Sequence, residues 1–137
     1  MDLVLREDIV PSRSDLLALY EAVGWTAYTR DAAALERAVA GSSYRIAAYR
    51  ADRLLGLARA ISDGVSIAYL QDVLVHPDVH RQGIGRRLVE AYLARHAHVR
   101  QKVLLTDGRT EQLEFYRALG YREASELGLH TFIRLEH

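Results

Sequence analysis

The sequence predicts an α+β protein built on a mixed, mostly antiparallel sheet. Three strand-like segments follow one another between residues 44 and 75, separated by turn-forming residues. Two helical patterns precede them, and helix and strand patterns alternate after them. Consecutive strands form antiparallel meanders, whereas a strand reached through a helix runs parallel to its neighbour. These observations together predict about six to seven strands flanked by about four helices.

Length and composition limit the classes of protein. The 137 residues suffice for one core, so residues 1–137 are interpreted as a single domain. The 18 basic and 18 acidic residues cancel, which disfavours nucleic-acid and membrane-surface partners. There is no cysteine, which excludes disulfides, thiolate zinc sites and thiol nucleophiles. A charged N-terminal segment and the lack of a long apolar run lead us to expect a cytoplasmic monomer or homodimer without a metal.

The N-terminal third predicts a strand and two helices. Residues 3–6 form the strand. Pro11 and the pair Ser12 and Ser14 then offer a turn and a cap for a helix whose apolar stripe ends at Gly24. Asp31 caps a second helix that reaches Gly41.

A predicted loop, residues 25–28, joins these helices. Its aromatic residues, Trp25 and Tyr28, either pack as a plug between the helices or line a substrate pocket.

The meander occupies the middle of the chain. Strands are predicted at residues 44–50, 54–61 and 65–75, and the turns at 51–53 and 62–64 separate them.

The second half alternates helix and strand. A helix follows Gly83, and residues 102–106 form a short strand parallel to the third strand of the meander. A last helix at 111–119 is followed by two predicted strands, 121–125 and 131–135, which form a hairpin.

A glycine turn connects the third meander strand to the helix. A helix start presents unpaired N–H groups, and residues without a Cβ let an anion approach them, so the turn suits a diphosphate. A Gly-x-Gly pair can also merely shape a turn. A dinucleotide site needs a third glycine where Leu88 stands. The consecutive amide donors are those of Arg81, Gln82, Gly83, Ile84, Gly85 and Arg86.

Two motifs together resemble a known family. The first is Asp-Val-Leu-Val-His-Pro at 72–77 with Gly-Ile-Gly at 83–85, and the second is Phe-Tyr-Arg-Ala-Leu-Gly-Tyr at 115–121. In this order they resemble the GNAT superfamily of acyl-CoA-dependent N-acyltransferases, over roughly residues 44 to 125. Arg-Ala-Ile-Ser-Asp at 59–63 is similar to a bacterial and plant arylalkylamine-type subgroup.

The resemblance implies a GNAT fold in which two central strands splay to admit acetyl-CoA as the acyl donor. The pantetheine arm would bond to the backbone of Val73, Leu74 and Val75 as an added strand. The family usually has Arg or Gln where His80 stands. It often has an asparagine near the last helix, where Thr110 or Thr106 is nearest.

The implied reaction is acetyl transfer to a primary amine by direct attack in a ternary complex. Asp72 matches a position where relatives often carry a carboxylate, so it is a candidate base; it could instead hold a water or a neighbouring arginine. His76 is a second candidate, or an exposed strand end. A backbone N–H near Val75 would serve the oxyanion. Tyr116 matches the family's acid for the thiolate, although its helical spacing also suits core packing.

Other functions remain open at this point. A catalytically silent CoA-binding regulatory or sensor module is favoured by His80 and the missing asparagine. An acetyltransferase acting on aminoacyl-tRNA is disfavoured by the neutral charge. The acceptor could be a small amine or a protein lysine.

Overall fold

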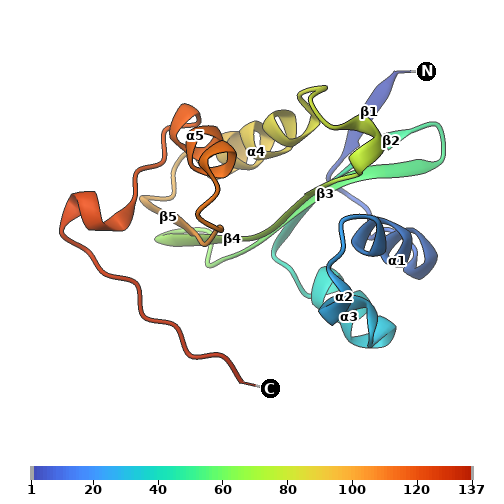
Figure 1. The fold of residues 1–137 in the computed structure, drawn as a ribbon, viewed down its shortest axis with the longest axis horizontal. Helices are drawn as coiled ribbons and strands as arrows, with labels where there is room; N and C mark the ends of the chain where they lie inside the picture. The colour runs from blue at the N-terminus through green and yellow to red at the C-terminus, as the bar shows by residue number, and fades with distance from the viewer. Residues whose placement is uncertain (1, 137) are drawn as a thin grey trace. The chain divides into compact units, whose positions relative to one another are not determined.

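A computed structural model describes residues 2–136 (Figure 1). The chain divides into two compact units, one up to Leu105 and one from Thr106 onward. The first unit holds the sheet, and the second holds one α-helix and one 3₁₀ turn. The single domain over residues 1–137 stays a prediction.

The sheet of the first unit is mixed, as predicted. Its order is β1-β2-β3-β4-β5, with antiparallel pairing from β1 to β4 and parallel pairing between β4 and β5. Over residues 2–136 the sheet has five strands, so the predicted six to seven are too many. The strands are β1 (Leu3–Arg6), β2 (Tyr44–Arg50), β3 (Arg53–Ser62), β4 (Ile67–Val75) and β5 (Gln101–Leu104).

Helices cover both faces of this sheet (Figure 1). On one face lie α1 (Arg13–Ala22), α2 (Thr26–Thr29) and α3 (Ala32–Ala40), and on the other lies α4 (Ile84–Arg95). The predicted caps of both helices are confirmed, and of the pair Ser12 and Ser14 it is Ser12 that caps α1. Ser12 Oγ accepts a hydrogen bond from the Asp15 amide at 3.2 Å, and Asp31 Oδ1 accepts one from the Ala34 amide at 3.0 Å.

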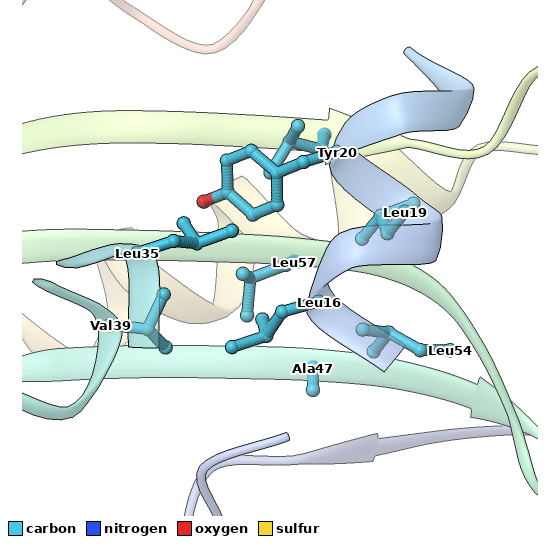
Figure 2. Packing of buried hydrophobic residues seen from close by; sticks show 9 residues of the cluster. Leu16, Leu19, Tyr20, Leu35, Val39, Ala47, Leu54 and Leu57 are labelled. Carbon is cyan, nitrogen blue, oxygen red and sulfur yellow. The ribbon is translucent and has the colours of Figure 1, made fainter. Parts of the chain in front are cut away.

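The core between α1, α3 and the sheet explains the apolar spacing of these segments. Its side chains interdigitate over the middle of β2, β3 and β4 (Figure 2). Because successive strand residues alternate between faces, β4 is alternately buried and half-buried over much of its length. The cluster contains Leu16, Leu19, Tyr20, Leu35, Val39, Ala47, Leu54, Leu57 and Leu74.

On the opposite face, α4 packs closely over Gly56 of β3. A Cβ built on Gly56 would lie 3.1 Å from Ile84 Cγ2, 3.1 Å from Leu88 Cδ1 and 3.2 Å from the Leu74 carbonyl oxygen. Ile84 and Leu88 are fully buried, so they have little room to move.

Gly56→Ala is therefore expected to destabilise the protein by about 1–3 kcal/mol, the usual cost of overpacking a core. Thermal unfolding measures the change. Gly108→Ala is the matched control, because its Cβ would meet nothing within 4 Å. Equal melting temperatures for the two variants would contradict the close packing of α4.

The predicted loop at residues 25–28 is wrong, since Thr26–Thr29 form the single helical turn α2. The Arg30 amide donates to the Thr26 carbonyl at 3.2 Å, and Thr29 Oγ1 donates to the same carbonyl. Local propensity did not predict this turn. It is held in place by contacts that Tyr28 makes with residues distant in sequence.

The second unit corrects the predicted C-terminal hairpin. It contains α5 (Thr110–Ala118) and the 3₁₀ helix η2 (Ala124–Leu127), and residues 128–136 have no regular structure. The strands predicted at 121–125 and 131–135 are therefore wrong. Glu123 and Glu126 form a reciprocal capping box, and Arg117 pairs with Glu123 at 2.6 Å. These local contacts favour a helical turn over an extended strand.

Candidate active site

The edge of β4 that faces β5 is only partly paired. β5 pairs with Ile67–Leu70 and ends there, whereas β4 continues to Val75. The His76 amide donates to the Leu55 carbonyl of β3 at 2.8 Å, so His76 directs its main chain toward β3. The N–H and C=O groups of successive strand residues point to opposite edges in turn, so those of Val73 and Val75 point away from β3. Within residues 2–136, no strand pairs with that edge beyond Leu70.

The same alternation separates Leu74 from this edge. Leu74 directs its main chain toward β3, and its side chain is buried in the cluster under α1. Of the three residues predicted to meet pantetheine through the backbone, the structure brings Val73 and Val75 to the open edge.

The predicted phosphate turn is a helix start without a side-chain cap. Gly83 is the N-cap of α4 with φ +78°, and the first helical bond runs from the Arg87 amide to the Gly83 carbonyl at 3.1 Å. The amides of residues 84–86 precede that bond, so the helix itself leaves them unpaired. The first turn of α4 has no acidic residue. This end of α4 is electropositive and open to an anion.

Two side chains before Gly83 shape the turn. Arg81 has φ +66°, a left-handed conformation that costs a residue with a Cβ about 1–2 kcal/mol. His80 Nε2 lies 3.0 Å from the Val75 carbonyl oxygen, so its ring ties the turn to the end of β4. Gln82 is exposed, and Arg86 forms an exposed ion pair with Glu90 at 3.5 Å.

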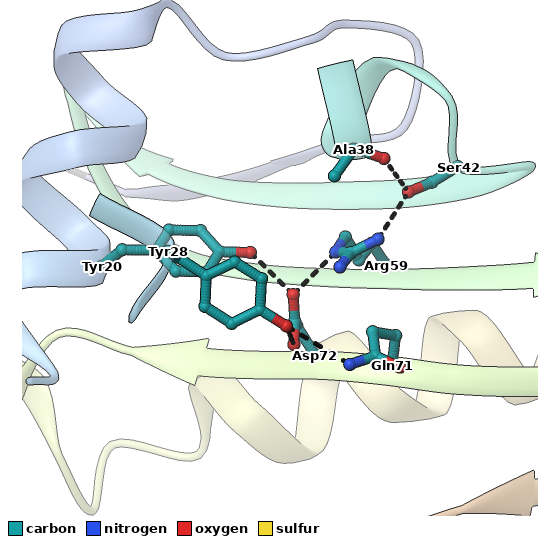
Figure 3. A network of polar contacts seen from close by, with 7 residues as sticks. All are labelled: Tyr20, Tyr28, Ala38, Ser42, Arg59, Gln71 and Asp72. Carbon is teal, nitrogen blue, oxygen red and sulfur yellow. Dashed lines mark hydrogen bonds and ion pairs between the residues drawn. The ribbon is translucent and has the colours of Figure 1, made fainter. Parts of the chain in front are cut away.

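The predicted base, Asp72, lies in a buried polar network (Figure 3). Its Oδ2 accepts a hydrogen bond from Arg59 Nε at 2.6 Å and one from the Tyr20 hydroxyl at 2.9 Å. Its Oδ1 accepts a hydrogen bond from the Tyr28 hydroxyl at 3.0 Å. Only 2% of the Asp72 side chain is exposed.

Electrostatics keep the two main partners of Asp72 in their donor forms. Burial opposes the charge of Arg59, but the attraction of Asp72 and their hydrogen bond outweigh burial and raise the Arg59 pKa. Burial, together with the Asp72 charge, raises the pKa of Tyr20 far above its usual value. At neutral pH the network therefore contains a charged guanidinium and a neutral phenol.

An aromatic cluster, formed by Tyr20, Trp25 and Tyr28, lies against this network. The Tyr20 and Tyr28 ring centroids are 5.1 Å apart, and the Trp25 ring stacks on Tyr28 at 6.2 Å. Trp25 is 37% exposed, so the cluster reaches the surface. The Gln71 side-chain amide donates to the Tyr28 hydroxyl at 3.3 Å.

The second candidate base, His76, is engaged at both ring nitrogens. Nδ1 accepts a hydrogen bond from the Asp78 amide at 3.1 Å, and Nε2 lies 3.3 Å from an Arg53 guanidinium nitrogen. His76 also lines a groove of about 510 Å³ that does not include Asp72. The groove runs between α1 and the turn that joins β2 to β3.

The second unit carries Tyr116 and Thr110. Thr110 is the first residue of α5 and is exposed. The Tyr116 ring meets Phe115 and Tyr121 edge-on, at centroid distances of 5.0 and 5.8 Å. Burial raises the pKa of Tyr116 to about 12.

Sequence reasoning missed Arg59, Tyr20 and Ser42 as members of the network. Arg59 Nη1 donates to Ser42 Oγ at 3.3 Å, and Ser42 Oγ donates to the Ala38 carbonyl at 2.9 Å. The available signal was an arginine in the interior of β3 and a single aspartate in β4, two largely apolar strands. A strand register that sets them opposite one another would have paired them.

Two further properties concern ligands and membranes. Among residues 2–136, no group of three or more histidines or carboxylates is arranged to hold a metal ion. No helix in the same range is both long enough and apolar enough to cross a bilayer.

Comparison with known proteins gives consistent matches. A family model described as an acetyltransferase (GNAT) domain matches residues 14–135. The histone acetyltransferase TAP1 of Glycine max is 33% identical over 128 residues, which cover 82% of this chain and 52% of that protein. The chain thus spans about half the length of this relative.

Solved structures share the fold. The GNAT family acetyltransferase SP0256 of Streptococcus pneumoniae TIGR4 matches with a TM-score of 0.85 at 29% identity, covering 98% of each chain. The aminoglycoside N-acetyltransferase AAC(6')-Iy in complex with CoA matches with a TM-score of 0.72 at 15% identity, covering 99% of this chain and 95% of that one.

Proposed function

Because the chain belongs to the GNAT acetyltransferase family, we propose that it transfers an acetyl group from acetyl-CoA to a primary amine. The observation that carries this proposal is the open edge of β4 at Val73 and Val75, followed in the chain by the uncapped start of α4. An extended thioester arm and a diphosphate need these two kinds of backbone donor. One structural neighbour was solved with CoA, which agrees with the proposal.

The cofactor would be held mainly by backbone groups. The diphosphate would accept hydrogen bonds from the amides of the turn and first helical residues, and Arg81 and Arg86 would add positive charge. The pantetheine arm would extend along Val73 and Val75. Thr110 stays a predicted contact in place of the family's asparagine. The predicted turn donors are Arg81, Gln82, Gly83, Ile84, Gly85 and Arg86.

The chemistry would proceed by direct attack. The neutral amine nitrogen forms a bond to the thioester carbonyl carbon, and the N–H of Val75 stabilises the resulting oxyanion. Collapse of the tetrahedral intermediate breaks the carbon–sulfur bond and releases the thiolate. The amine loses a proton to solvent, directly or through a base. The chain has no cysteine to carry a covalent acyl group, which favours a ternary complex.

Tyr116 would supply the proton or hydrogen bond that the thiolate needs. Its pKa of about 12 keeps the phenol protonated at neutral pH and makes it a weaker acid than an ordinary tyrosine. Donation of a hydrogen bond to the developing thiolate is then its main contribution.

The proposed setting follows from composition. The absence of cysteine and the balanced charge fit a cytoplasmic enzyme that acts on small amines or protein lysines as a monomer or homodimer. The relative named as a histone acetyltransferase keeps a protein lysine among the proposed acceptors.

The proposal is tested by measuring CoA release with a thiol reagent. The protein has no cysteine, so the reagent reports released CoA without background from the enzyme. Acetyl-CoA is presented with a panel of a polyamine, an arylalkylamine, an amino sugar and a lysine peptide. Amine-dependent release is expected with at least one acceptor. In double-reciprocal plots of the initial rates, intersecting lines indicate a ternary complex, whereas parallel lines indicate a covalent intermediate.

The rival function is a CoA-binding regulatory or sensor module. The His80 ring favours it, because it occupies the Val75 carbonyl oxygen at the open edge. Tight acetyl-CoA binding without release on any amine would support this module and overturn the transferase proposal. Failure to bind CoA at all would overturn both.

A further inference from the structure

We propose that Asp72 is a positioning residue, which holds the aromatic cluster in place beside the acceptor amine, and that it does not take the proton of the amine. This inference rests on the proposed acetyl transfer, since it concerns the acceptor side of that site. It differs from the prediction that a carboxylate at this position is the base.

Both oxygens of the Asp72 carboxylate already accept hydrogen bonds. Three donors, from Arg59, Tyr20 and Tyr28, lie within 3.0 Å of its two oxygens. With 2% of its side chain exposed, Asp72 offers almost no surface to an amine or a water. A general base must contact the proton that it removes, directly or through one water.

Accepting a proton would also disrupt the network. A neutral Asp72 would leave the guanidinium of Arg59 without its counter-charge, although only 8% of the Arg59 side chain is exposed. Removing one partner of a buried ion pair is strongly unfavourable, because the remaining charge is cut off from water. The buried ion pair with Arg59 therefore suits a structural anchor better than a proton acceptor.

What Asp72 anchors is the turn α2. This helix has four residues, no side-chain cap and no fully buried residue, so it has little stability of its own. The polar contacts that connect it to the sheet include the bond from the Tyr28 hydroxyl to Asp72, and Gln71 donates to the same hydroxyl. Figure 3 shows the Tyr28 bonds to Asp72 and Gln71. Trp25 stacks on Tyr28, so the anchor also positions Trp25.

The aromatic cluster lies where it could bind the acceptor amine. Asp72 immediately precedes Val73, the first residue of the open β4 edge along which the thioester would lie. The exposed face of Trp25 and the aromatic ring of Tyr28 offer a wall that attracts an apolar or cationic amine through its π-face. Loosening α2 should then weaken acceptor binding more than it slows the chemical step.

The test compares Asp72→Asn, Tyr28→Phe and the double variant. Asparagine keeps an acceptor oxygen for Arg59 and places an NH2 donor beside the Tyr28 hydroxyl, so a charge-assisted hydrogen bond is replaced by a weaker neutral one. Phenylalanine removes only the hydroxyl. Each single variant is expected to raise the acceptor KM about five- to tenfold, the effect of one hydrogen bond, with kcat changed less than about threefold. The double variant should raise KM no further than Tyr28→Phe alone, since both changes act on the same connection.

A base role predicts a different pattern. Asp72→Asn would then lower kcat by about 10²- to 10⁴-fold and change the shape of its pH profile, while Tyr28→Phe would leave both intact. That result, or additive effects in the double variant, would overturn the proposal. Tyr49→Phe is the matched control, because it removes a hydroxyl from the same unit outside the network.

Amide hydrogen exchange provides a readout that needs no activity. Exchange at residues 26–30 is expected to be about fivefold faster in both single variants than in the parent, because the hydrogen bond that holds α2 is weakened in Asp72→Asn and lost in Tyr28→Phe. Unchanged exchange in Tyr28→Phe would overturn the anchoring role even if Asp72→Asn fails to fold. Faster exchange in variants of a protein that acetylates no amine would overturn the transferase proposal and leave the anchoring role of Asp72 supported.

Discussion

Valine in place of Gly83 is expected to weaken coenzyme A binding at least about a hundredfold, through loss of one or two hydrogen bonds to a charged group at about 1.5–3 kcal/mol each. Gly83 has φ +78°, a region that residues with a Cβ rarely adopt and that β-branched residues avoid most. Because Gly83 is the N-cap of α4, a change in its φ re-aims the amides of residues 84–86. Calorimetric titration with coenzyme A measures the loss.

The neighbouring glycine gives a second form of this prediction. Gly85 is the second residue of α4, and a valine side chain there would stand between the helix amides and an approaching phosphate. Gly85→Val is therefore expected to abolish cofactor binding as well.

Gly64→Val is the matched control for Gly83→Val. Gly64 has φ +77°, and a Cβ at either glycine would meet nothing within 4 Å, so both substitutions add the same backbone strain. Gly64 belongs to the turn between β3 and β4, far along the chain from the α4 start. The control should lose stability and keep its affinity for coenzyme A. Full affinity in folded Gly83→Val would rule out the phosphate turn.

Phenylalanine in place of Tyr116 is expected to lower kcat by about 10²-fold or more, the usual contribution of a positioned proton donor. The affinity for acetyl-CoA should stay within about twofold, because the hydroxyl acts on charge that develops only as the thiolate leaves. Single-turnover rates and a separate binding titration distinguish the two effects. Tyr121→Phe, which alters a neighbouring ring of the same unit, is the control and should retain its turnover.

The raised pKa of Tyr116 also predicts how kcat depends on pH. Burial moves the pKa from 10.0 to about 12, so the phenol stays protonated between pH 9 and 11, where an ordinary tyrosine ionises. Loss of the Tyr116 proton should therefore not lower kcat in that range. In a spectrophotometric titration of the parent protein, Tyr116 should give a tyrosine absorbance change near pH 12. The same change should be missing from Tyr116→Phe. Unaltered turnover in that variant would remove Tyr116 from the mechanism.

Several elements could be predicted because their signals are local. Ser12 and Asp31 cap their helices, and the three consecutive strands pair as an antiparallel meander. The strand that follows α4 pairs in parallel with β4, as a helical crossover requires. The prediction of a C-terminal hairpin was wrong because it rested on the local strand pattern of residues 121–125 and 131–135. A strand also needs a neighbour to pair with, and the described structure provides none there.

The sequence by itself determined the class of fold and the helix start at Gly83, since apolar periodicity, caps and glycine turns act over a few residues. It indicated the family only through the resemblance of the motifs at 72–85 and 115–121 to a known one. Only the tertiary structure decided that the Asp72 carboxylate would be occupied. Its partners come from β3, α1 and α2, up to 52 residues away in the chain. Such a network depends on strand register and helix packing, because a buried charge needs a partner in space and not in sequence.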